Sequence, residues 1–126
     1  MKPATRIEHV PSVKVEIFIA GDAEKARQIC QKFCDDRGLC VTVTETTYVY
    51  TGGREAGVIV GLINYPRFPS DAAAIGDKAA HLALRLREGL GQESFTIQGL
   101  DWAHWYSWRD QDSGEDQNPE SKETRP

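Results

Sequence analysis

The 126-residue sequence has few cysteines, no long apolar run and no short catalytic signature. Its three cysteines, Cys30, Cys34 and Cys40, lack the spacing of a disulfide framework, and only Cys30 and Cys34 have the short spacing of a zinc-binding pair. A zinc site needs a second pair of ligands, so structural thiols in a reducing compartment are favoured. No stretch approaches the roughly 20 apolar residues of a membrane span, and the N-terminus lacks the apolar core of a signal peptide. We therefore expect a cytoplasmic protein with no membrane contact, metal or cofactor.

An excess of one sign of charge is also missing from most of the sequence and occurs only at the C-terminus. Residues 109–126 contain three basic and six acidic side chains, so they carry −3 of the formal net charge of −4. This segment contains no hydrophobic residue, which predicts a disordered acidic tail. The nearly neutral body lacks the clustered cations that bind phosphates, so nucleic-acid binding is not expected. We divide the chain into an arm (1–11), one domain (12–108) and the tail (109–126).

Motifs that define an enzyme class are missing from the sequence. There is no phosphate-binding glycine loop, nucleophile elbow or zinc-protease motif. Neither a Ser-His-Asp set nor a pair of carboxylates can be argued from the spacing. No catalytic residue is therefore assigned from the sequence alone.

Hydrophobic periodicity predicts an alternation of strands and helices. Period-two patterns indicate strands, whereas spacings of three and four residues, with an N-capping side chain and a terminal glycine, indicate helices. The predicted strands are 13–20, 39–50, 58–65 and 94–98, and the predicted helices run from Asp22 to Gly38 and from Ser70 to Gly91. Residues 51–57 are predicted to form a glycine-rich hairpin connection.

This β-α-β-β-α-β order predicts an α+β protein with a four-stranded antiparallel sheet and both helices on one face. It resembles the ferredoxin-like superfold, whose members include RNA-recognition motifs, acylphosphatases and dimeric α/β-barrel proteins. The aromatic RNA-binding signature is absent from the predicted third strand. Residues 50–69 also look like small uncharacterised bacterial and phage-borne proteins.

The segment Leu100–Trp108 has two interpretations. As a strand after a bulge at Gly99, it would place Trp102, His104, Tyr106 and Trp108 on one face and Trp105 on the other. As a helix, it would line its tryptophans along one side. Aromatic strand propensity favours the extended form.

Apolar residues on both faces of strand 58–65 predict that the open face of the sheet needs a cover. Either the aromatic C-terminal segment folds across it, or a second copy of the chain stacks on it or exchanges its Trp-rich strand. We therefore expect a homodimer.

Three surfaces are candidates for interaction or ligand binding. One is the hairpin tip, and another is the strand-to-helix loop, where an arginine and backbone amides could bind an anion. The third is the Trp-rich segment. Their residues are Tyr48, Tyr50 and Arg54; Asn64, Tyr65, Arg67 and Phe68; and Trp102, His104 and Trp105.

The surplus of apolar and aromatic surface favours association over catalysis. The first hypothesis is that this chain is a non-enzymatic interaction module, such as a phage or bacterial accessory or inhibitor protein. It would bind a second copy of itself and an unidentified protein. The alternative is a small enzyme or metabolite-binding regulator. Its resemblance to dimeric α/β-barrel proteins implies a cavity between sheet and helices, with His104 and Tyr65 as candidates.

Overall fold

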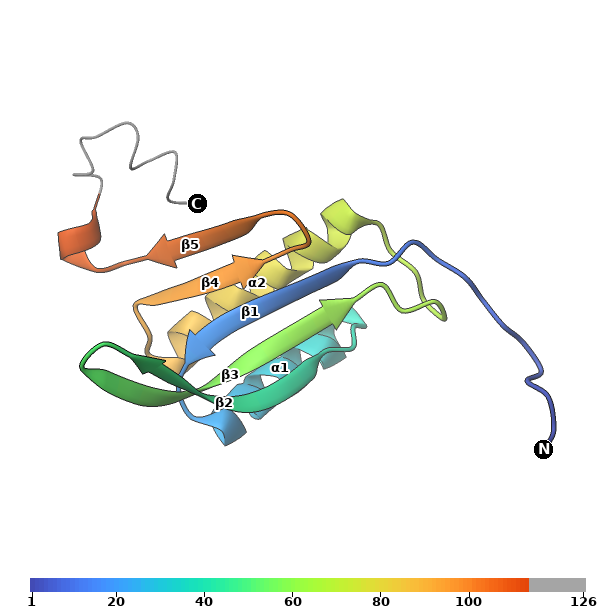
Figure 1. Cartoon of the computed structure of the whole chain (residues 1–126), viewed down its shortest axis with the longest axis horizontal. Coiled ribbons are helices and arrows are strands. Elements are labelled where there is room, and N and C mark those ends of the chain that lie inside the picture. Colours follow the sequence, from blue (N-terminus) through green and yellow to red (C-terminus); the bar gives the residue numbers. More distant parts are fainter. Residues whose placement is uncertain (114–126) are drawn as a thin grey trace.

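A computed structural model describes residues 1–113 of the chain. Within them, five strands form one antiparallel sheet, and two α-helices lie against one of its faces (Figure 1). The strands, in chain order, are β1 (Lys14–Ala20), β2 (Thr42–Tyr50), β3 (Gly53–Ile63), β4 (Ser94–Gln98) and β5 (Ala103–Ser107). The helices are α1 (Ala23–Arg37) and α2 (Ala72–Leu90), and a short 3₁₀ turn, η1, spans Asp110–Asp112.

The sheet order is β2-β3-β1-β4-β5, so the first strand occupies the centre. The prediction of a four-stranded sheet is therefore wrong by one strand. The Trp-rich segment adopts the extended form, but it pairs with β4 at the sheet edge and does not fold across the open face. A strand that continues the sheet satisfies its backbone groups on one side, which a segment crossing the face could not do.

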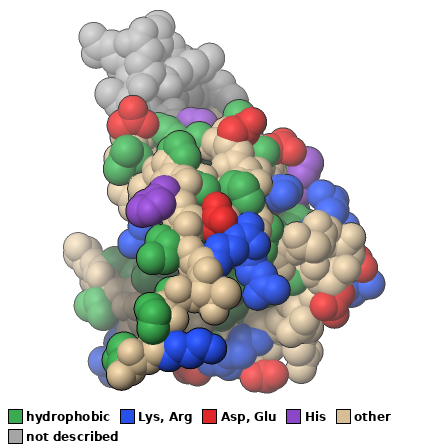
Figure 2. All heavy atoms as spheres, turned by 90° about the vertical axis from the view of Figure 1, so that its right-hand side faces the viewer, with side chains coloured by type: hydrophobic (Ala, Val, Ile, Leu, Met, Phe, Trp, Pro, Cys, Tyr) green, Lys and Arg blue, Asp and Glu red, His purple; other side chains and the backbone are tan. Residues whose placement is uncertain are grey.

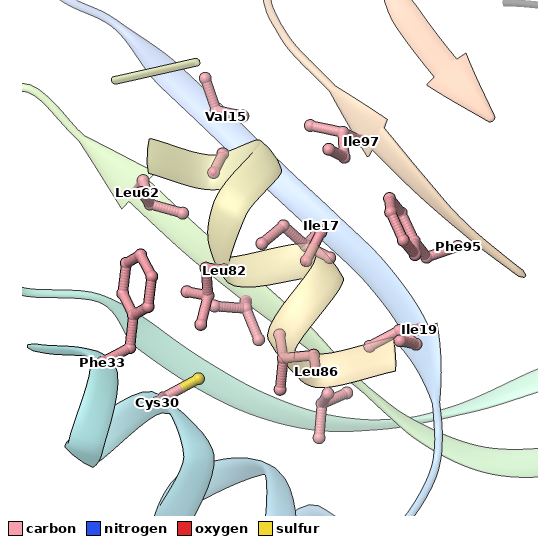
Figure 3. Packing of buried hydrophobic residues seen from close by; sticks show 14 of the residues in the cluster. Val15, Ile17, Ile19, Cys30, Phe33, Leu62, Leu82, Leu86, Phe95 and Ile97 are labelled. Carbon is pink, nitrogen blue, oxygen red and sulfur yellow. The ribbon is translucent and has the colours of Figure 1, made fainter. Parts of the chain in front are cut away.

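The core lies between the sheet and the helices. Val15, Ile17 and Ile19 of β1 point towards Leu82 and Leu86 of α2 (Figure 3). Phe33 and Cys30 of α1 fill the space beside Leu62 in the same view. Period-two alternation on the strands and the three-to-four spacing on the helices therefore predict the core correctly.

Both helices begin and end at capping residues. Asp22 accepts a hydrogen bond from the Lys25 amide, and Gly38 ends α1 in the left-handed conformation. Helix α2 is capped by Asp71, whose carboxylate accepts from the Ala74 amide, and not by Ser70 as predicted. A carboxylate is at least as good a cap as a hydroxyl, and the Ser70 amide is occupied by a different contact.

The described part of the chain contains no helix long and apolar enough to cross a membrane. The predicted tail begins at residue 109. Its first residues form η1, and residues 114–126 lie outside the described residues.

Candidate functional site

The face of the sheet without helices carries a mixed set of side chains. On β1, Phe18 alternates with the core-facing residues and therefore lies on the open face. It is paired with Ile59 on β3 and with Thr96 on β4. Phe18 is half-buried although no helix covers it. In Figure 1 the helices lie behind the sheet, so this open face is turned towards the viewer.

Tyr48 of β2 lies across the neighbouring strand on this face. Its hydroxyl donates a hydrogen bond of 2.6 Å to the carbonyl oxygen of Val58. The ring passes over Gly57, because a Cβ at that position would come within 2.4 Å of the Tyr48 Cε2 atom. Burial raises the pKa of Tyr48 to about 12, so the hydroxyl stays protonated near neutral pH and remains a donor.

A cavity of about 180 Å³ lies on the open face beside Tyr48. One wall carries Tyr48 and Glu55, which are directly paired across β2 and β3. The opposite wall carries Trp105 of β5 and Arg109. Phe18, Ala20 and Thr96 line it between these walls, and the remaining lining residues are Ile19, Gln92, Ser94 and Phe95.

Arg109 is held in place by a small network at the end of β5. Its amide donates to the Ser107 hydroxyl oxygen at 3.1 Å, and that hydroxyl donates to Asp112 at 2.8 Å. The Arg109 guanidinium lies 3.7 Å from the same Asp112 carboxylate. The cavity therefore combines aromatic rings with one carboxylate and one guanidinium on different walls.

Of the residues predicted from the sequence, Tyr48 and Trp105 line this cavity together. Tyr50 and Arg54 do not line it. Tyr50 is at the hairpin tip and 54% exposed, and Arg54 pairs with Val49 on the other face of the hairpin.

The loop after β3 lies at the opposite end of the sheet. Asn64 is buried there, its amide donating to the Pro11 carbonyl at 2.9 Å and its carbonyl accepting from the Ser70 amide at 2.8 Å. The Tyr65 and Phe68 rings lie 5.3 Å apart, and a hydrogen bond to Cys40 raises the pKa of Tyr65. Asn64 therefore ties the N-terminal arm to the start of α2.

Arg67 of this loop is exposed. Figure 2 views the molecule from this end, where Lys and Arg side chains gather beside scattered hydrophobic and acidic ones. A cavity of about 450 Å³ next to Asn64 is lined mainly by apolar residues and includes no arginine or lysine. The lining of this cavity therefore does not include Arg67, and an anion site in this loop stays a prediction.

Trp102 and His104 contact each other, with ring centroids 4.8 Å apart. His104 alternates with Trp105 along β5, so it belongs to the other face of the sheet. Strands β1 and β4 separate β5 from β3, after which Tyr65 follows. His104 and Tyr65, the pair suggested for an enzyme, are therefore not brought together.

Sequence reasoning missed Phe18, Glu55, Thr96 and Arg109 as cavity residues. Phe18 carried a signal, since it interrupts the polar row expected on an open face. Glu55 was assigned to a connection, whereas the turn contains only Thr51 and Gly52 and β3 begins at Gly53. Arg109 was assigned to the tail.

No protein-family model matches the sequence, and no curated protein sequence matches it either. The fold, however, is similar to solved enzyme structures from phage. An apo phage SAM lyase aligns with a TM-score of 0.66 and 16% identity, over 84% of this chain and all of that one. A phage SAM lyase in complex with S-methyl-5′-thioadenosine aligns with a TM-score of 0.61 and 13% identity, over 86% and 100% respectively.

These comparisons correct the functional prediction. Both matched structures are enzymes, so the hypothesis of a non-enzymatic protein-binding module is wrong. Its alternative, a small enzyme, agrees better with them. The sequence-based prediction failed because aromatic surface on an open sheet was interpreted as an interface for a protein. Such a surface also suits a small planar ligand.

Proposed function

We propose that this protein is a phage-type lyase that cleaves S-adenosylmethionine and releases S-methyl-5′-thioadenosine at the open-face cavity. The observation that carries the proposal is the similarity to phage SAM lyases over their entire length. The composition of the cavity supports it independently, since the aromatic and charged groups suit this class of ligand.

S-adenosylmethionine has a planar adenine, a sulfonium cation and a zwitterionic amino-acid group. Trp105 and Phe18 supply aromatic surface on which an adenine ring can stack. Glu55 supplies a negative charge that attracts a cation, and aromatic faces do the same for a sulfonium group. Tyr48 is fixed by its bond to Val58 and provides a rigid wall.

The proposed reaction needs no water and no external nucleophile. The bond between the sulfur and the γ-carbon breaks, its electron pair goes to the sulfur, and the product is a neutral thioether. The substrate's own carboxylate oxygen forms a bond to the γ-carbon and closes a five-membered lactone, so atoms and charge balance. Among the described residues, those that line the cavity include no thiol, imidazole or amine, but they do include the Glu55 carboxylate and the hydroxyls of Ser94 and Thr96. The proposed reaction assigns none of these groups as the nucleophile, because the substrate supplies its own.

The cavity is small for such a ligand. Its volume of about 180 Å³ is below the roughly 300 Å³ at which small-molecule pockets commonly begin. We propose that a second copy of the chain covers the open face and completes the site, as a homodimer. Size-exclusion chromatography with light scattering at micromolar concentration tests this, and a monomer in the presence of ligand would overturn it.

Two finer assignments belong to the same proposal. We assign the first four strands and the two helices to a ferredoxin-like arrangement, supported by their order in the chain and in the sheet, with β5 as an addition at one edge. The three free cysteines suit a cytoplasmic location, where thiols stay reduced.

The experiment is to incubate the purified full chain with S-adenosylmethionine and to follow S-methyl-5′-thioadenosine by liquid chromatography and mass spectrometry. The rate without protein is subtracted, because the substrate also decomposes slowly by itself. We expect thioether and lactone in equal amounts. In ¹⁸O-labelled water, early product carrying label in the newly formed carbon–oxygen bond would indicate hydrolysis. No product above background would overturn the proposal.

A further inference from the structure

We propose that Arg109 binds the carboxylate of the substrate's amino-acid group and so selects adenosyl compounds that carry an amino acid. This inference rests on the proposed function, since it assigns one end of the same substrate. It concerns a residue that sequence reasoning placed in the tail.

The position of Arg109 makes one wall of the cavity positively charged. It lies beyond the end of β5, on the wall that also carries Trp105, whereas Glu55 lies on the wall formed by β2 and β3. Among the described residues that line the cavity, these two carry the charged side chains. A zwitterionic group placed between opposite charges is attracted in one orientation and repelled in the other.

The Arg109 side chain is partly ordered before any ligand binds. Asp112 lies 3.7 Å from a terminal nitrogen of the guanidinium, and Asp112 is itself fixed by the Ser107 hydroxyl. A guanidinium has five N–H donors, so one long contact leaves donors for a second carboxylate. Because this contact restricts the side chain in part, somewhat less side-chain entropy is lost when the ligand binds.

The Asp112 carboxylate is also the nearest competing anion, and it reduces the positive charge offered to a ligand. The ion pair is loose and partly exposed, with side-chain exposures of 39% for Arg109 and 23% for Asp112. Exposed pairs of this kind contribute little to stability. Replacing Arg109 is therefore expected to leave the fold intact, which makes its effect on ligands measurable.

This assignment also explains how substrate and product would differ in affinity. S-methyl-5′-thioadenosine has no carboxylate, so it makes no contact with Arg109. Once the bond to the amino-acid group breaks, the thioether retains only the aromatic contacts. A guanidinium that holds one carboxylate oxygen leaves the other oxygen available for ring closure.

The test compares two unreactive ligands by calorimetry: S-adenosylhomocysteine, which has the carboxylate, and S-methyl-5′-thioadenosine, which lacks it. We expect Arg109→Gln to weaken the first roughly 10- to 100-fold, the effect of losing a charge-assisted hydrogen bond. The second ligand should change by less than about twofold, and Arg109→Lys should be intermediate. Lys32→Gln, on the exposed side of α1, removes the same charge far from the cavity and serves as the control.

Equal weakening of both ligands by Arg109→Gln, or no weakening of either, would overturn the role of Arg109 while leaving the proposed function standing. A wild-type protein that binds neither ligand would overturn the ligand class and the role of Arg109 together. Circular dichroism of each variant confirms that the fold is retained.

Discussion

The ring of Tyr48 rests on the backbone of Gly57, with no room for a side chain between them. A Cβ at Gly57 would come within 2.4 Å of the Tyr48 ring and 2.7 Å of the Ile19 carbonyl oxygen. Gly57→Ala should therefore destabilise the protein by about 1–3 kcal/mol, as overpacking does. Urea denaturation measures this.

Gly76 offers a matched control within α2, since a Cβ there would meet nothing within 4 Å. Gly76→Ala should stabilise by about 0.5–1 kcal/mol, because alanine restricts the unfolded chain and favours the helix. A neutral Gly57→Ala would contradict the close contact with Tyr48.

Glu55→Gln tests the charged wall of the proposed site. The carboxylate is exposed, so its replacement should not change the fold. Loss of the negative charge should reduce formation of S-methyl-5′-thioadenosine by about 10²-fold, comparable to removing one electrostatic group from an active site. Glu24→Gln on α1 is the control and should retain full activity. An active Glu55→Gln protein would place the reaction elsewhere.

Trp105→Ala tests the aromatic wall. Stacking of a base on an aromatic ring contributes about 1–3 kcal/mol, so the Kd for S-methyl-5′-thioadenosine should rise roughly 5- to 150-fold. Trp105→Phe should retain much of the affinity. Trp108→Phe removes indole on the other side of the sheet, where Arg87 lies 4.1 Å from the Trp108 ring, and it should not alter binding. Calorimetry decides between these outcomes.

Asn64→Ala separates a structural role from a ligand-binding one. It removes hydrogen bonds to Pro11 and Ser70 at a buried position, and each unpaired backbone group costs about 1–3 kcal/mol. The melting temperature should fall by several degrees, while ligand affinity stays unchanged when measured well below the transition. A stable variant with weakened ligand binding would contradict this role.

Alkaline pH should destabilise the protein through Cys30, which is buried, and Tyr48, which is half-buried. Burial raises the pKa of Cys30 from 9.0 to about 12 and that of Tyr48 from 10.0 to about 12. Both groups therefore stay protonated in the folded state at a pH where they ionise in the unfolded chain. The stabilisation is fully present below pH 9 and is lost between pH 9 and 12.

Denaturant midpoints measured from pH 8 to 11 would show this decline. Tyr48→Phe should make the denaturant midpoint fall less steeply with pH above pH 10. Tyr50→Phe changes an exposed ring and should leave this pH dependence unchanged. An identical slope in both variants would contradict the burial of Tyr48.

Local patterns in the sequence predicted much of the fold, because alternation and capping are local signals. The buried faces of β1 and α2 follow directly from the spacing of Val15, Ile17, Leu82 and Leu86. The position of β5 beside β4 could not be predicted in the same way. A strand signal on residues 103–107 does not state which neighbour it pairs with.

The glycines of the hairpin led to a wrong prediction of where β3 begins. Gly53 and Gly57 were attributed to turn geometry, but both belong to the strand, and Gly57 is required by the ring of Tyr48. The consequence was that Glu55 was missed. The hydrogen bond of Asn64 could not be predicted for another reason: its partner Pro11 is 53 residues away, and no local pattern reveals such a contact.

The walls of the proposed site come from distant parts of the sequence, with Phe18 in β1 and Arg109 after β5. The proposed site is therefore complete only after both β1 and the residues that follow β5 have been synthesised. Any truncated product that ends before Trp105 lacks one wall. Under the proposed function, a chain that terminates before β5 is expected to be fully inactive, not partly active.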